Sequence, residues 1–327
     1  MTATAILPAR RATTADEQQI LALMRRSLGW LEDEHYQAFF RWKHQANPFG
    51  ASPGWVATDG DIIAGFRTFM RWRFEKDGEI VTAVRAVDTA THPDYRGQGI
   101  FTQLTKAALE DLRADGVGFV FNTPNDQSLP GYLKMGWEIV GRLGVGFRPR
   151  SVASLVTVAR ARTPAELGSL PTTAGLPAPI VLEDAPPVSA LLAKLPRATG
   201  LRTHRTAAFL RWRYGLPALH YRALLLRGEV EDGVLFFRLR RRGPAVELVI
   251  ADLLVPPGRS RTVGPAIRRL VQVAGADYAV GLSATLPNRT LVPLPRAGPV
   301  LTQRPLCFVN LPPLAGWHMT MGDVELF

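Results

Sequence analysis

Cysteine is nearly missing from this chain of 327 residues, which contains only Cys307. One cysteine cannot form an intramolecular disulfide or build a thiolate metal site, so neither is expected to support the fold. The six histidines are scattered, and no two of them are three or four residues apart. This spacing predicts no metal site.

Long hydrophobic runs are also missing. No apolar stretch approaches the ~18–20 residues that a membrane-spanning helix requires. The first residues lack the basic start and the long apolar core of a secretory signal. With 46% hydrophobic and 20% charged residues, the composition is that of a globular protein without membrane contacts, for which a cytoplasmic location is the default expectation. The length fits two domains of ~100–200 residues each.

Lysine is scarce, although the chain is strongly basic. It supplies 5 of the 39 basic residues, which exceed the 28 acidic residues and give a net charge of +11. Such a field attracts anionic molecules, and arginine favours bidentate contacts with phosphates and carboxylates. The charge alone does not decide between a nucleic acid and a phosphorylated cofactor.

Proline separates two halves of the chain. Seven prolines lie between Ala161 and Gly200, and proline at this density breaks helices and strands. We therefore place a Pro/Ala-rich connection at 151–200, between one domain at 1–150 and another at 201–327. The flanking halves contain similar pieces in the same order, which indicates a tandem duplication. The pairs are Phe39–Lys43 with Phe209–Arg213, Val87–Pro93 with Ala251–Pro257, and Phe121–Asn125 with Ser283–Asn288.

The first half alternates helices and strands. Apolar residues at helical spacing predict helices over 14–28, 35–43 and 100–112. Strands are predicted over 55–58, 62–74, 79–90 and 117–121. Asp-Gly turns separate the first three strands and favour an antiparallel meander. The predicted fold class is α/β in the broad sense of helices packed on a sheet, and the antiparallel strands make it an α+β fold.

A glycine turn joins a predicted strand directly to a predicted helix within Val87–Phe101. Its centre reads Arg96-Gly97-Gln98-Gly99-Ile100. Successive backbone N–H groups in such a turn, with the positive end of a helix behind them, form a nest for a pyrophosphate. Glycine is needed there because a Cβ would block the close approach of the backbone. The alternative is a plain tight connection.

These residues resemble a known family. Arg96–Ile100, after a Pro-Asp-Tyr lead-in, is similar to the acyl-CoA-binding signature of the GNAT superfamily of N-acyltransferases, written Arg/Gln-x-x-Gly-x-Gly/Ala. Asn125–Trp137 resembles the family's later motif, in which an asparagine precedes by seven residues the tyrosine of Tyr-x-Lys-x-Gly-aromatic. The resemblance covers residues 8–148. One departure is Phe101, which stands at the usual Gly/Ala position.

The resemblance implies two tandem GNAT-like domains, each with a mixed, mostly antiparallel central sheet flanked by helices. In the second half the counterpart of the glycine turn, Pro256–Gly264, lacks the Arg-Gly-x-Gly pattern, and proline has no N–H group to offer. We therefore expect residues 201–327 to form a degenerate GNAT-like domain that shapes the acceptor pocket.

The resemblance also implies roles for single residues. Tyr132 is the candidate general acid that protonates the departing sulfur, and its alternative role is that of a packed core tyrosine. Asn125 would hydrogen-bond the pantetheine arm, with an Asx turn as the alternative. The expected acyl-CoA contacts are Thr89, Ala90, Thr91, Arg96, Gly97, Gln98, Gly99, Ile100, Phe101, Asn125 and Ser128.

The sequence offers several candidates for the general base. Asp88 lies on the strand before the glycine turn and is the first candidate, but the same carboxylate could instead hold a neighbouring arginine such as Arg85. The other candidates are His92, Glu138, the C-terminal carboxylate of Phe327, and bulk water.

Arginines also recur at alternate positions in two predicted strands. Arg67, Arg71 and Arg73 share one face of a strand, and Arg238, Arg240 and Arg242 repeat the arrangement in the second half. Each row is either a solvated sheet face or part of a basic groove for an anionic acceptor.

The expected function is an acetyl-CoA-dependent N-acyltransferase without a metal. It would move an acetyl group to a primary amine of a small-molecule or peptide acceptor by direct attack in a ternary complex, and an anionic acceptor is one option. Aminoacyl-tRNA-dependent peptidyl transfer is one alternative, because such enzymes also use tandem GNAT-like domains. A non-enzymatic acyl-CoA-sensing module, with a second domain that contacts a partner or nucleic acid, is the other.

Overall fold

The chain folds into two compact units. A computed structural model describes residues 7–28, 34–161, 163–196, 199–287 and 290–325. Unit 1 consists of Met1–Phe74, Ile80–Gly141 and Val300–Leu311, and unit 2 of Glu75–Glu79, Arg142–Pro299 and Pro312–Phe327. Each unit therefore combines segments that are far apart in the sequence.

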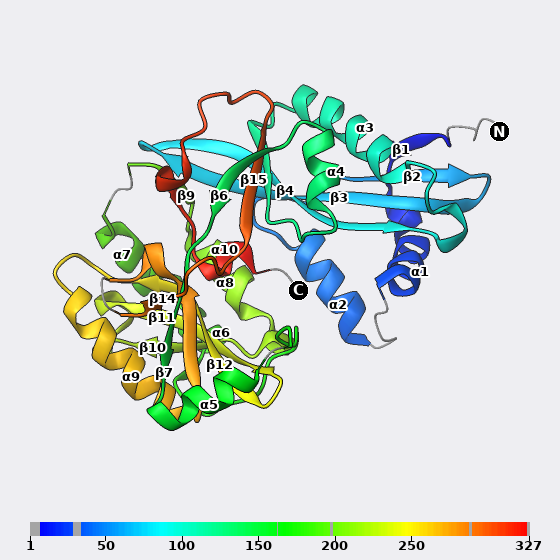
Figure 1. Ribbon diagram of the computed structural model, residues 1–327. Coiled ribbons are helices and arrows are strands. Elements are labelled where there is room, and N and C mark those ends of the chain that lie inside the picture. The colour runs from blue at the N-terminus through cyan, green and yellow to red at the C-terminus, as the bar shows by residue number, and fades with distance from the viewer. Residues whose placement is uncertain (1–6, 29–33, 162, 197–198, 288–289, 326–327) are drawn as a thin grey trace. The chain divides into compact units, whose positions relative to one another are not determined.

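Unit 1 is built on a sheet with the strand order β1-β2-β3-β4-β5-β15-β6 (Figure 1). The strands are β1 (Ala9–Arg11), β2 (Gly54–Asp59), β3 (Ile62–Lys76), β4 (Glu79–Thr91), β5 (Phe119–Asn122), β15 (Val300–Pro305) and β6 (Glu138–Arg142). The helices are α1 (Glu17–Leu28), α2 (Glu34–His44), α3 (Ile100–Ala114) and α4 (Leu129–Lys134). These elements confirm the helices and strands predicted for the first half, including the antiparallel β2–β3 pair.

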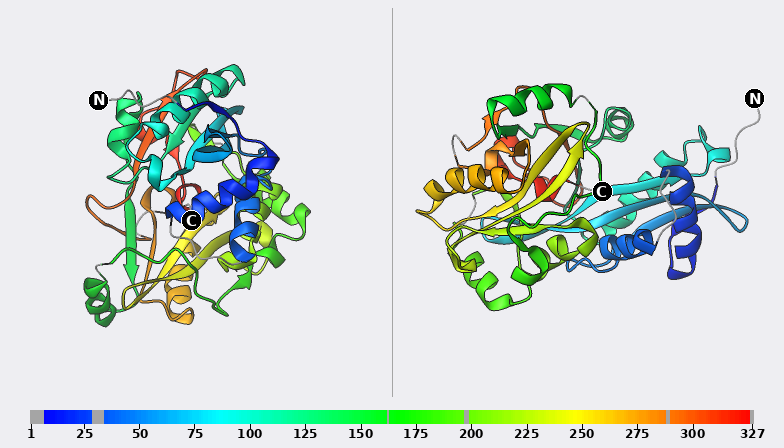
Figure 2. Two further views of the ribbon diagram at one scale, coloured as in Figure 1. Left: turned by 90° about the vertical axis from the view of Figure 1, so that its right-hand side faces the viewer. Right: turned by 90° about the horizontal axis from the view of Figure 1, so that it is seen from below.

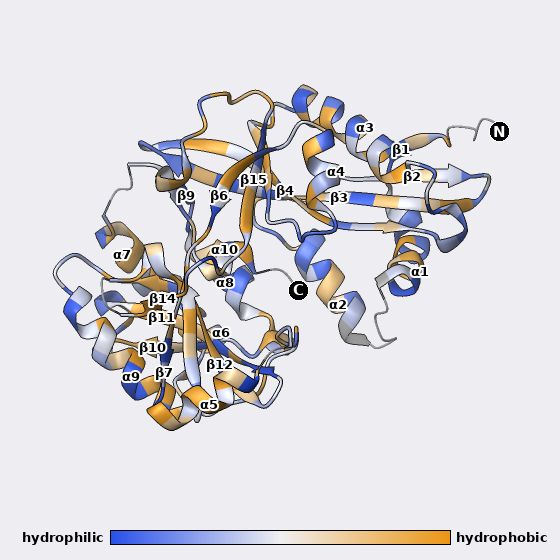
Figure 3. Cartoon of the chain, viewed as in Figure 1, coloured by the Kyte–Doolittle hydropathy of each residue, from blue (hydrophilic) through white to orange (hydrophobic). Residues whose placement is uncertain are grey.

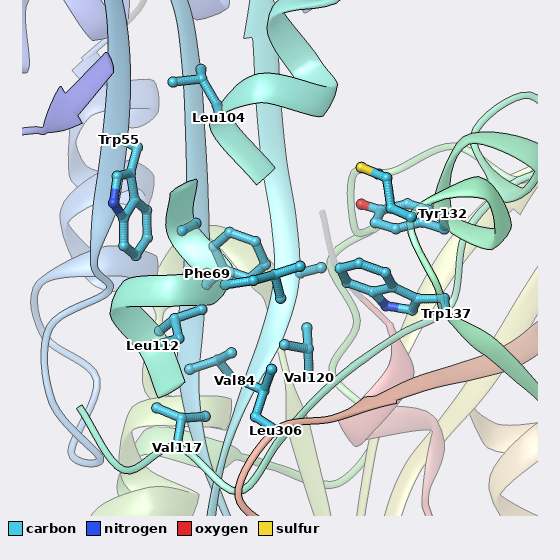
Figure 4. Packing of buried hydrophobic residues seen from close by; sticks show 14 of the residues in the cluster. Trp55, Phe69, Val84, Leu104, Leu112, Val117, Val120, Tyr132, Trp137 and Leu306 are labelled. Carbon is cyan, nitrogen blue, oxygen red and sulfur yellow. The ribbon is translucent and has the colours of Figure 1, made fainter. Parts of the chain in front are cut away.

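Helices cover both faces of this sheet. Figures 1 and 2 show α1 and α2 on one face and α3 with α4 on the other. Successive strand residues point to opposite faces: Val56 packs with the buried residues of α1 and α2, whereas Trp55 and Ala57 pack with α3. Figure 4 shows the core beneath α3, which includes Leu104 and Leu306.

Unit 2 contains a second sheet, with the order β14-β7-β13-β12-β11-β10-β8. Its strands are β14 (Val292–Pro293), β7 (Val145–Pro149), β13 (Tyr278–Leu282), β12 (Ala245–Leu254), β11 (Val234–Arg242), β10 (Arg222–Leu225) and β8 (Leu176–Pro177). Two short strands, β9 (Leu201–Thr203) and β16 (Trp317–His318), pair with each other in parallel. The helices are α5 (Val152–Arg160), α6 (Ala178–Val181), α7 (Ala185–Lys194), α8 (Ala207–Gly215), α9 (Val263–Val273) and α10 (Met321–Val324).

The two sheets repeat one plan. In each sheet a parallel pair joins two consecutive strands, β4 with β5 and β12 with β13, and the chain between the paired strands contains a helix, α3 or α9. Figure 3 shows apolar residues gathered on the strands, while α9 carries hydrophobic and hydrophilic residues side by side. The apolar side of α9, including Ile267 and Leu270, is buried in the core of unit 2. The fold class and the two mostly antiparallel sheets are as predicted.

One strand of each sheet comes from a distant part of the chain. Strand β15, which comes late in the sequence, pairs with β5 and lies between β5 and β6 in unit 1. Strand β7, which comes much earlier in the sequence than its neighbours, pairs with β13 in unit 2 and corresponds in position to β15 beside β5. The segment at 151–200, expected to be a connection, contributes α5 to α7 and β8, and buries Val188 and Leu191.

Candidate functional site

The glycine turn of unit 1 has the backbone of an anion nest. Gly97 and Gly99 have φ angles of 77° and 78°, a region that favours glycine. Gly99 is the N-cap of α3. Within the described chain, no backbone hydrogen bond uses the N–H group of Gly97, Gln98 or Gly99. A Cβ at Gly97 or Gly99 would meet no atom within 4 Å, so there is room for a ligand against these N–H groups.

The strand before this turn has an unpaired stretch. The parallel ladder between β4 and β5 runs from the Ala83–Phe119 pair to the Arg85–Phe121 pair. Strand β5 ends at Asn122, whereas β4 continues to Thr91. Among the described residues, the end of β4 therefore has no strand neighbour on the β5 side as it leads into the glycine turn.

The predicted acyl-CoA contacts around this turn differ in exposure. Arg96, Gly97, Gln98 and Gly99 are exposed, while Ile100 is buried in the core below α3. On β4, Ala90 is buried against α1 and α2. The flanking Thr89 and Thr91 are half-buried, and the Thr89 hydroxyl donates to the Phe66 carbonyl at 3.3 Å.

Phe101, the departure from the family signature, does not fill the nest. Its ring lies edge-on to that of Tyr132, with centroids 5.6 Å apart, and the Arg67 guanidinium lies 5.3 Å from its centroid. A Cβ on Gly131 of α4 would come within 3.5 Å of the same ring. The side chain therefore points toward α4 and brings the first turn of α3 against Tyr132.

Tyr132 is both packed and hydrogen-bonded. It is 4% exposed, and it lies beside Trp137 at one side of the core (Figure 4). Arg67 Nη2 donates to the Tyr132 hydroxyl oxygen at 2.8 Å, and Arg67 Nη1 donates to the Val87 carbonyl at 2.7 Å. Because a guanidinium can only donate, the proton of the Tyr132 hydroxyl is free for another acceptor.

Asn125 and Ser128 form a local turn before α4. The Asn125 side-chain oxygen accepts from the backbone N–H group of Ser128 at 2.9 Å and from its hydroxyl at 2.8 Å. This is the Asx-type turn that the sequence allowed as an alternative. Asn125 is exposed, and the turn positions the helix that carries Tyr132.

Asp88 is held by two residues at the end of α2. Lys43 Nζ lies 2.9 Å from Oδ1 of Asp88, and His44 Nε2 lies 2.8 Å from Oδ2. The Lys43 and His44 side chains are 2% and 5% exposed, against 15% for Asp88. Arg85, the partner considered from the sequence, instead donates to the Thr123 hydroxyl at 3.0 Å.

This cluster shifts the protonation of its members. Burial opposes ionisation of Asp88, but the charge of Lys43 and the contacts with His44 outweigh it and lower the pKa of the carboxyl. Burial also lowers the pKa of His44, although Asp88 partly opposes this shift. A neutral His44 that donates from Nε2 keeps its lone pair on Nδ1, and the buried Nδ1 atom has no hydrogen-bond partner in the described part of the chain.

The remaining candidate bases lie elsewhere. His92 Nε2 is 2.7 Å from a guanidinium nitrogen of Arg26. The Glu138 side chain is exposed on β6 and contacts Gln303 at 3.5 Å. Phe327 lies outside the described residues. Across the described residues, no group of three or more histidine, cysteine or acidic side chains could hold a metal ion.

Three residues of this site were not predicted. Lys43 is the last residue of the repeated segment Phe39–Lys43 and His44 directly follows it, which is the one signal that could have marked them. Arg67 belongs to a predicted arginine row, but it is fully buried, as is Arg238 in the other row. A solvated face is therefore wrong for these two residues, whereas Arg73 is exposed.

Comparisons with known proteins agree with this geometry. Residues 8–140 match the family described as acetyltransferase (GNAT) domain. No sequence among the curated proteins is significantly similar to the chain.

No helix formed by the described residues is long and apolar enough to cross a membrane.

Several solved structures share the fold over nearly the whole chain. A probable N-acyltransferase from Enterococcus faecalis is 12% identical, with a TM-score of 0.61 over 93% of this chain and 74% of that chain. A GCN5-related N-acetyltransferase from Anabaena variabilis is 16% identical, with a TM-score of 0.58 over 91% of this chain and 73% of that chain.

A third similar structure is that of Eis1 from Mycobacterium abscessus. It is 15% identical, with a TM-score of 0.56 over 92% of this chain and 74% of that chain. At these identities the structures establish the fold, while the sequence match of residues 8–140 shows what this part of the chain is similar to. Through residues 8–140, this chain is similar to the GNAT acetyltransferase domain.

Proposed function

We propose that unit 1 is an acyl-CoA-dependent N-acetyltransferase that uses acetyl-CoA. The observation that carries the proposal is the pair of left-handed glycines, Gly97 and Gly99, at the start of α3, where the end of β4 has lost its β5 neighbour. Free N–H groups at a helix N-terminus bind phosphate oxygens. Acetyl-CoA supplies a pyrophosphate for this nest and a thioester as the acetyl donor.

The end of β4 would hold the pantetheine and thioester part of the donor. Its backbone groups from Asp88 to Thr91 face no strand on the β5 side, so an N–H group there can donate to the thioester carbonyl. Such a donor stabilises the negative charge that develops on this oxygen during acyl transfer. Asn125 and Ser128 would contact the same arm from the turn before α4.

Tyr132 would protonate the departing thiolate. Arg67 donates to the hydroxyl oxygen of Tyr132 and fixes its position, while the hydroxyl proton remains available. Phe101 packs against the Tyr132 ring and ties this residue to the first turn of α3. The acid therefore stands beside the nest that would hold the donor.

Asp88 and His44 would together accept the proton of the attacking amine. Asp88 is the more exposed member of the pair and would meet the proton first. The lowered pKa of Asp88 makes it a weak base alone. In the neutral tautomer that carries its proton on the unpartnered Nδ1 atom, His44 would take this proton from Asp88 at Nε2.

The acceptor would be a primary amine of a small molecule or peptide that attacks the thioester directly in a ternary complex. We propose that residues 201–327 form a degenerate GNAT-like domain without an acyl-CoA nest of its own. Its counterpart of the glycine turn contains Pro256 and Pro257, which lack N–H groups.

The test is release of free CoA from acetyl-CoA in the presence of a panel of primary amines, with the acetylated product identified by mass spectrometry. Tyr132→Phe should lower turnover by a factor of ~10²–10⁴, the usual contribution of a general acid, and should leave acetyl-CoA affinity unchanged. Tyr95→Phe is the matched control, because it also removes one hydroxyl, which donates to Asp59 at 2.7 Å. Acetyl-CoA binding without turnover on any amine would favour the acyl-CoA-sensing alternative, and equal turnover of Tyr132→Phe would remove this residue from the mechanism.

A further inference from the structure

Unit 2 contains a cavity of about 490 Å³ that the proposed acetyl transfer does not use. All of its described lining residues belong to unit 2. Residues 252–255, at the end of β12 and just beyond it, line one side, and Ala284 and Thr285, which follow β13, line another. The cavity therefore lies where β12 and β13 diverge, and its volume is within the range of small-molecule sites, ~300–1,000 Å³.

This cavity meets the edge of β12 and not only one of its faces. Successive side chains of a strand point to opposite faces, yet every residue of 252–255 lines the cavity. On one side β12 pairs with β11 as far as Leu254 and Val234. On the other side its ladder with β13 ends at Val249 and Val280. Among the described residues, the end of β12 therefore has no strand partner on the β13 side.

The backbone at this edge offers a free donor. The N–H group of Leu253 donates to Oδ1 of Asp252 at 3.0 Å, whereas the N–H group of Val255 has no hydrogen-bond partner among the described residues. An unpaired strand edge favours an extended chain whose amide groups continue the ladder. A ligand that suits this edge would therefore contain secondary amides spaced as in a peptide.

The charged side chains of the lining are already matched. Arg202 Nη2 donates to both carboxylate oxygens of Glu75, at 3.2 and 3.1 Å, and Arg205 Nε donates to Asp252 at 2.7 Å. The described lining contains no other aspartate, glutamate, lysine or arginine. A charged ligand would have to compete with one of these pairs, and separating a buried pair is costly. An uncharged ligand fits this lining better.

The remaining lining favours an apolar side chain and excludes a phosphate nest. Burying apolar surface is favourable at ~25 cal/mol per Å². The chain leaves β12 through Pro256 and Pro257, which have no N–H groups to offer to a phosphate. The apolar residues of the lining include Leu192, Leu195, Leu254 and Val255.

The cavity occupies the place in unit 2 that matches the proposed donor slot of unit 1. Asp252 follows the last β12–β13 pair by three residues, and Asp88 follows the last β4–β5 pair by the same number. Unit 1 continues from this point into the glycine turn, whereas unit 2 continues into two prolines. The diverging strands are thus common to both units, but the group that would bind phosphate is not.

We propose that this cavity binds a short, uncharged peptide that extends along the edge of β12. The amide groups of the peptide would pair with the backbone of residues 253–255, and one apolar side chain would contact the leucines of the lining. Every described residue that forms this site lies in unit 2. The proposal therefore does not depend on acetyl transfer by unit 1.

The test compares three probes on the full chain by calorimetry and ligand-observed NMR. The first is N-acetyl-leucyl-alanine methylamide, the second replaces the amide between leucine and alanine by an ester, and the third ends in a free carboxylate. The first should bind at least about fivefold more tightly than either of the others, because the ester lacks one N–H donor and the carboxylate is charged. No binding of the first at ~10 mM, or tighter binding of either analogue, would overturn the proposal.

Two pairs of variants locate the peptide. Val255→Pro removes the free N–H group but keeps an apolar side chain, and should weaken binding at least about fivefold. Its control, Val255→Ile, keeps both and should bind as wild type does. Ala284→Trp adds a large side chain at an exposed residue of the lining and should abolish binding, while Ala153→Trp, at an exposed residue of α5 outside the lining, should not. Thermal unfolding of each variant checks its fold.

Saturating acetyl-CoA separates this site from the matching slot of unit 1. Peptide binding should be the same with and without acetyl-CoA, because the cavity lies wholly in unit 2. Peptide binding that acetyl-CoA abolishes would place the peptide in unit 1. Peptide binding that survives both Val255→Pro and Ala284→Trp would place it outside this cavity. Either result would contradict the proposal, whether or not unit 1 transfers acetyl groups.

Discussion

His44 Nε2 lies 2.8 Å from Oδ2 of Asp88 and joins the end of α2 to β4. The second unit repeats this contact with a different side chain, because the hydroxyl of Tyr214 on α8 donates to Oδ2 of Asp252 on β12 at 3.2 Å. Corresponding aspartates, Asp88 and Asp252, therefore contact corresponding helices in the two units, but the helix residue is a histidine in unit 1 and a tyrosine in unit 2. This difference supports the assignment of proton transfer to unit 1.

The His44 contact predicts a pH dependence of stability. Because burial lowers the pKa of His44, the folded chain binds fewer protons here than the unfolded chain, in which histidine titrates near 6.5. Stability therefore rises with pH through this region and is lost as the pH falls below about 6.5, by at most ~1.4 kcal/mol per pH unit. Asp88 does not contribute in this window, since its lowered pKa matters only below about 4.

We expect the free energy of unfolding of the wild type to fall more steeply than that of His44→Gln between about pH 7.5 and 5, as measured by urea denaturation. His220→Asn is the control, because His220 is exposed and asparagine tolerates its positive φ of 45°. It should keep the wild-type slope. Equal slopes for the wild type and His44→Gln would show that His44 is not held neutral by the fold.

The position of β15 predicts that residues 1–150 do not fold alone. Residues Thr302–Pro305 of β15 pair with Phe119–Asn122 of β5, and Leu301 and Thr302 are fully buried. Without β15 this edge of β5 loses its partner and exposes backbone groups that favour aggregation. The fragment 1–150 should show no cooperative thermal transition by circular dichroism.

A fragment of residues 1–141 joined to 300–311 by a Gly/Ser linker should recover a cooperative transition. Such a fragment contains every segment of unit 1, together with residues 75–79, which join β3 to β4 and would be kept. If the fragment 1–150 melts as cooperatively as the linked fragment, β15 is not required for the fold of unit 1.

Phe101 should matter for stability and not for donor affinity. Its half-buried ring packs on Tyr132 and Arg67, so Phe101→Ala should cost about 2 kcal/mol, less than truncation of a fully buried phenylalanine. The same change restores the small residue of the family signature. We expect acetyl-CoA affinity within about threefold of wild type by calorimetry; a tenfold gain would mean that Phe101 obstructs the nest.

Local features were predictable from the sequence because their causes are local. Apolar periodicity located α1, α2 and α3, and the glycine pair located the turn with positive φ. The duplicated pieces also occupy matching places, since Phe39–Lys43 lies on α2 and Phe209–Arg213 on α8. Asn288, the last residue of the third pair, lies outside the described residues.

The rest depends on contacts between distant segments. Thr302 meets Asn122 across 180 residues, and a strand pattern does not identify the partner of a strand. Asp88 is separated from Lys43 and His44 by about 45 residues, so its partners depend on how α2 packs on the sheet. Alternation placed Arg67 on a face of β3, but only the packed structure shows that this face is covered and that Tyr132 and the Val87 carbonyl satisfy the guanidinium.

The most direct test of the central claim is acetyl-CoA binding to wild type, Gly99→Trp and Gly116→Trp, measured by calorimetry and by thermal unfolding. Gly99 and Gly116 lie at opposite ends of α3 and have φ angles of 78° and 73°. A Cβ added at either glycine would meet no atom within 4 Å. The two changes therefore impose similar backbone strain, but only the first fills the nest.

Wild type and Gly116→Trp should bind acetyl-CoA, and at ~100 times the dissociation constant each should gain ~2.7 kcal/mol of stability, a rise in Tm of several degrees. Gly99→Trp should show neither effect. Failure of wild type to bind at millimolar acetyl-CoA, or equal binding by Gly99→Trp, would contradict the assignment of the glycine turn as the acyl-CoA site.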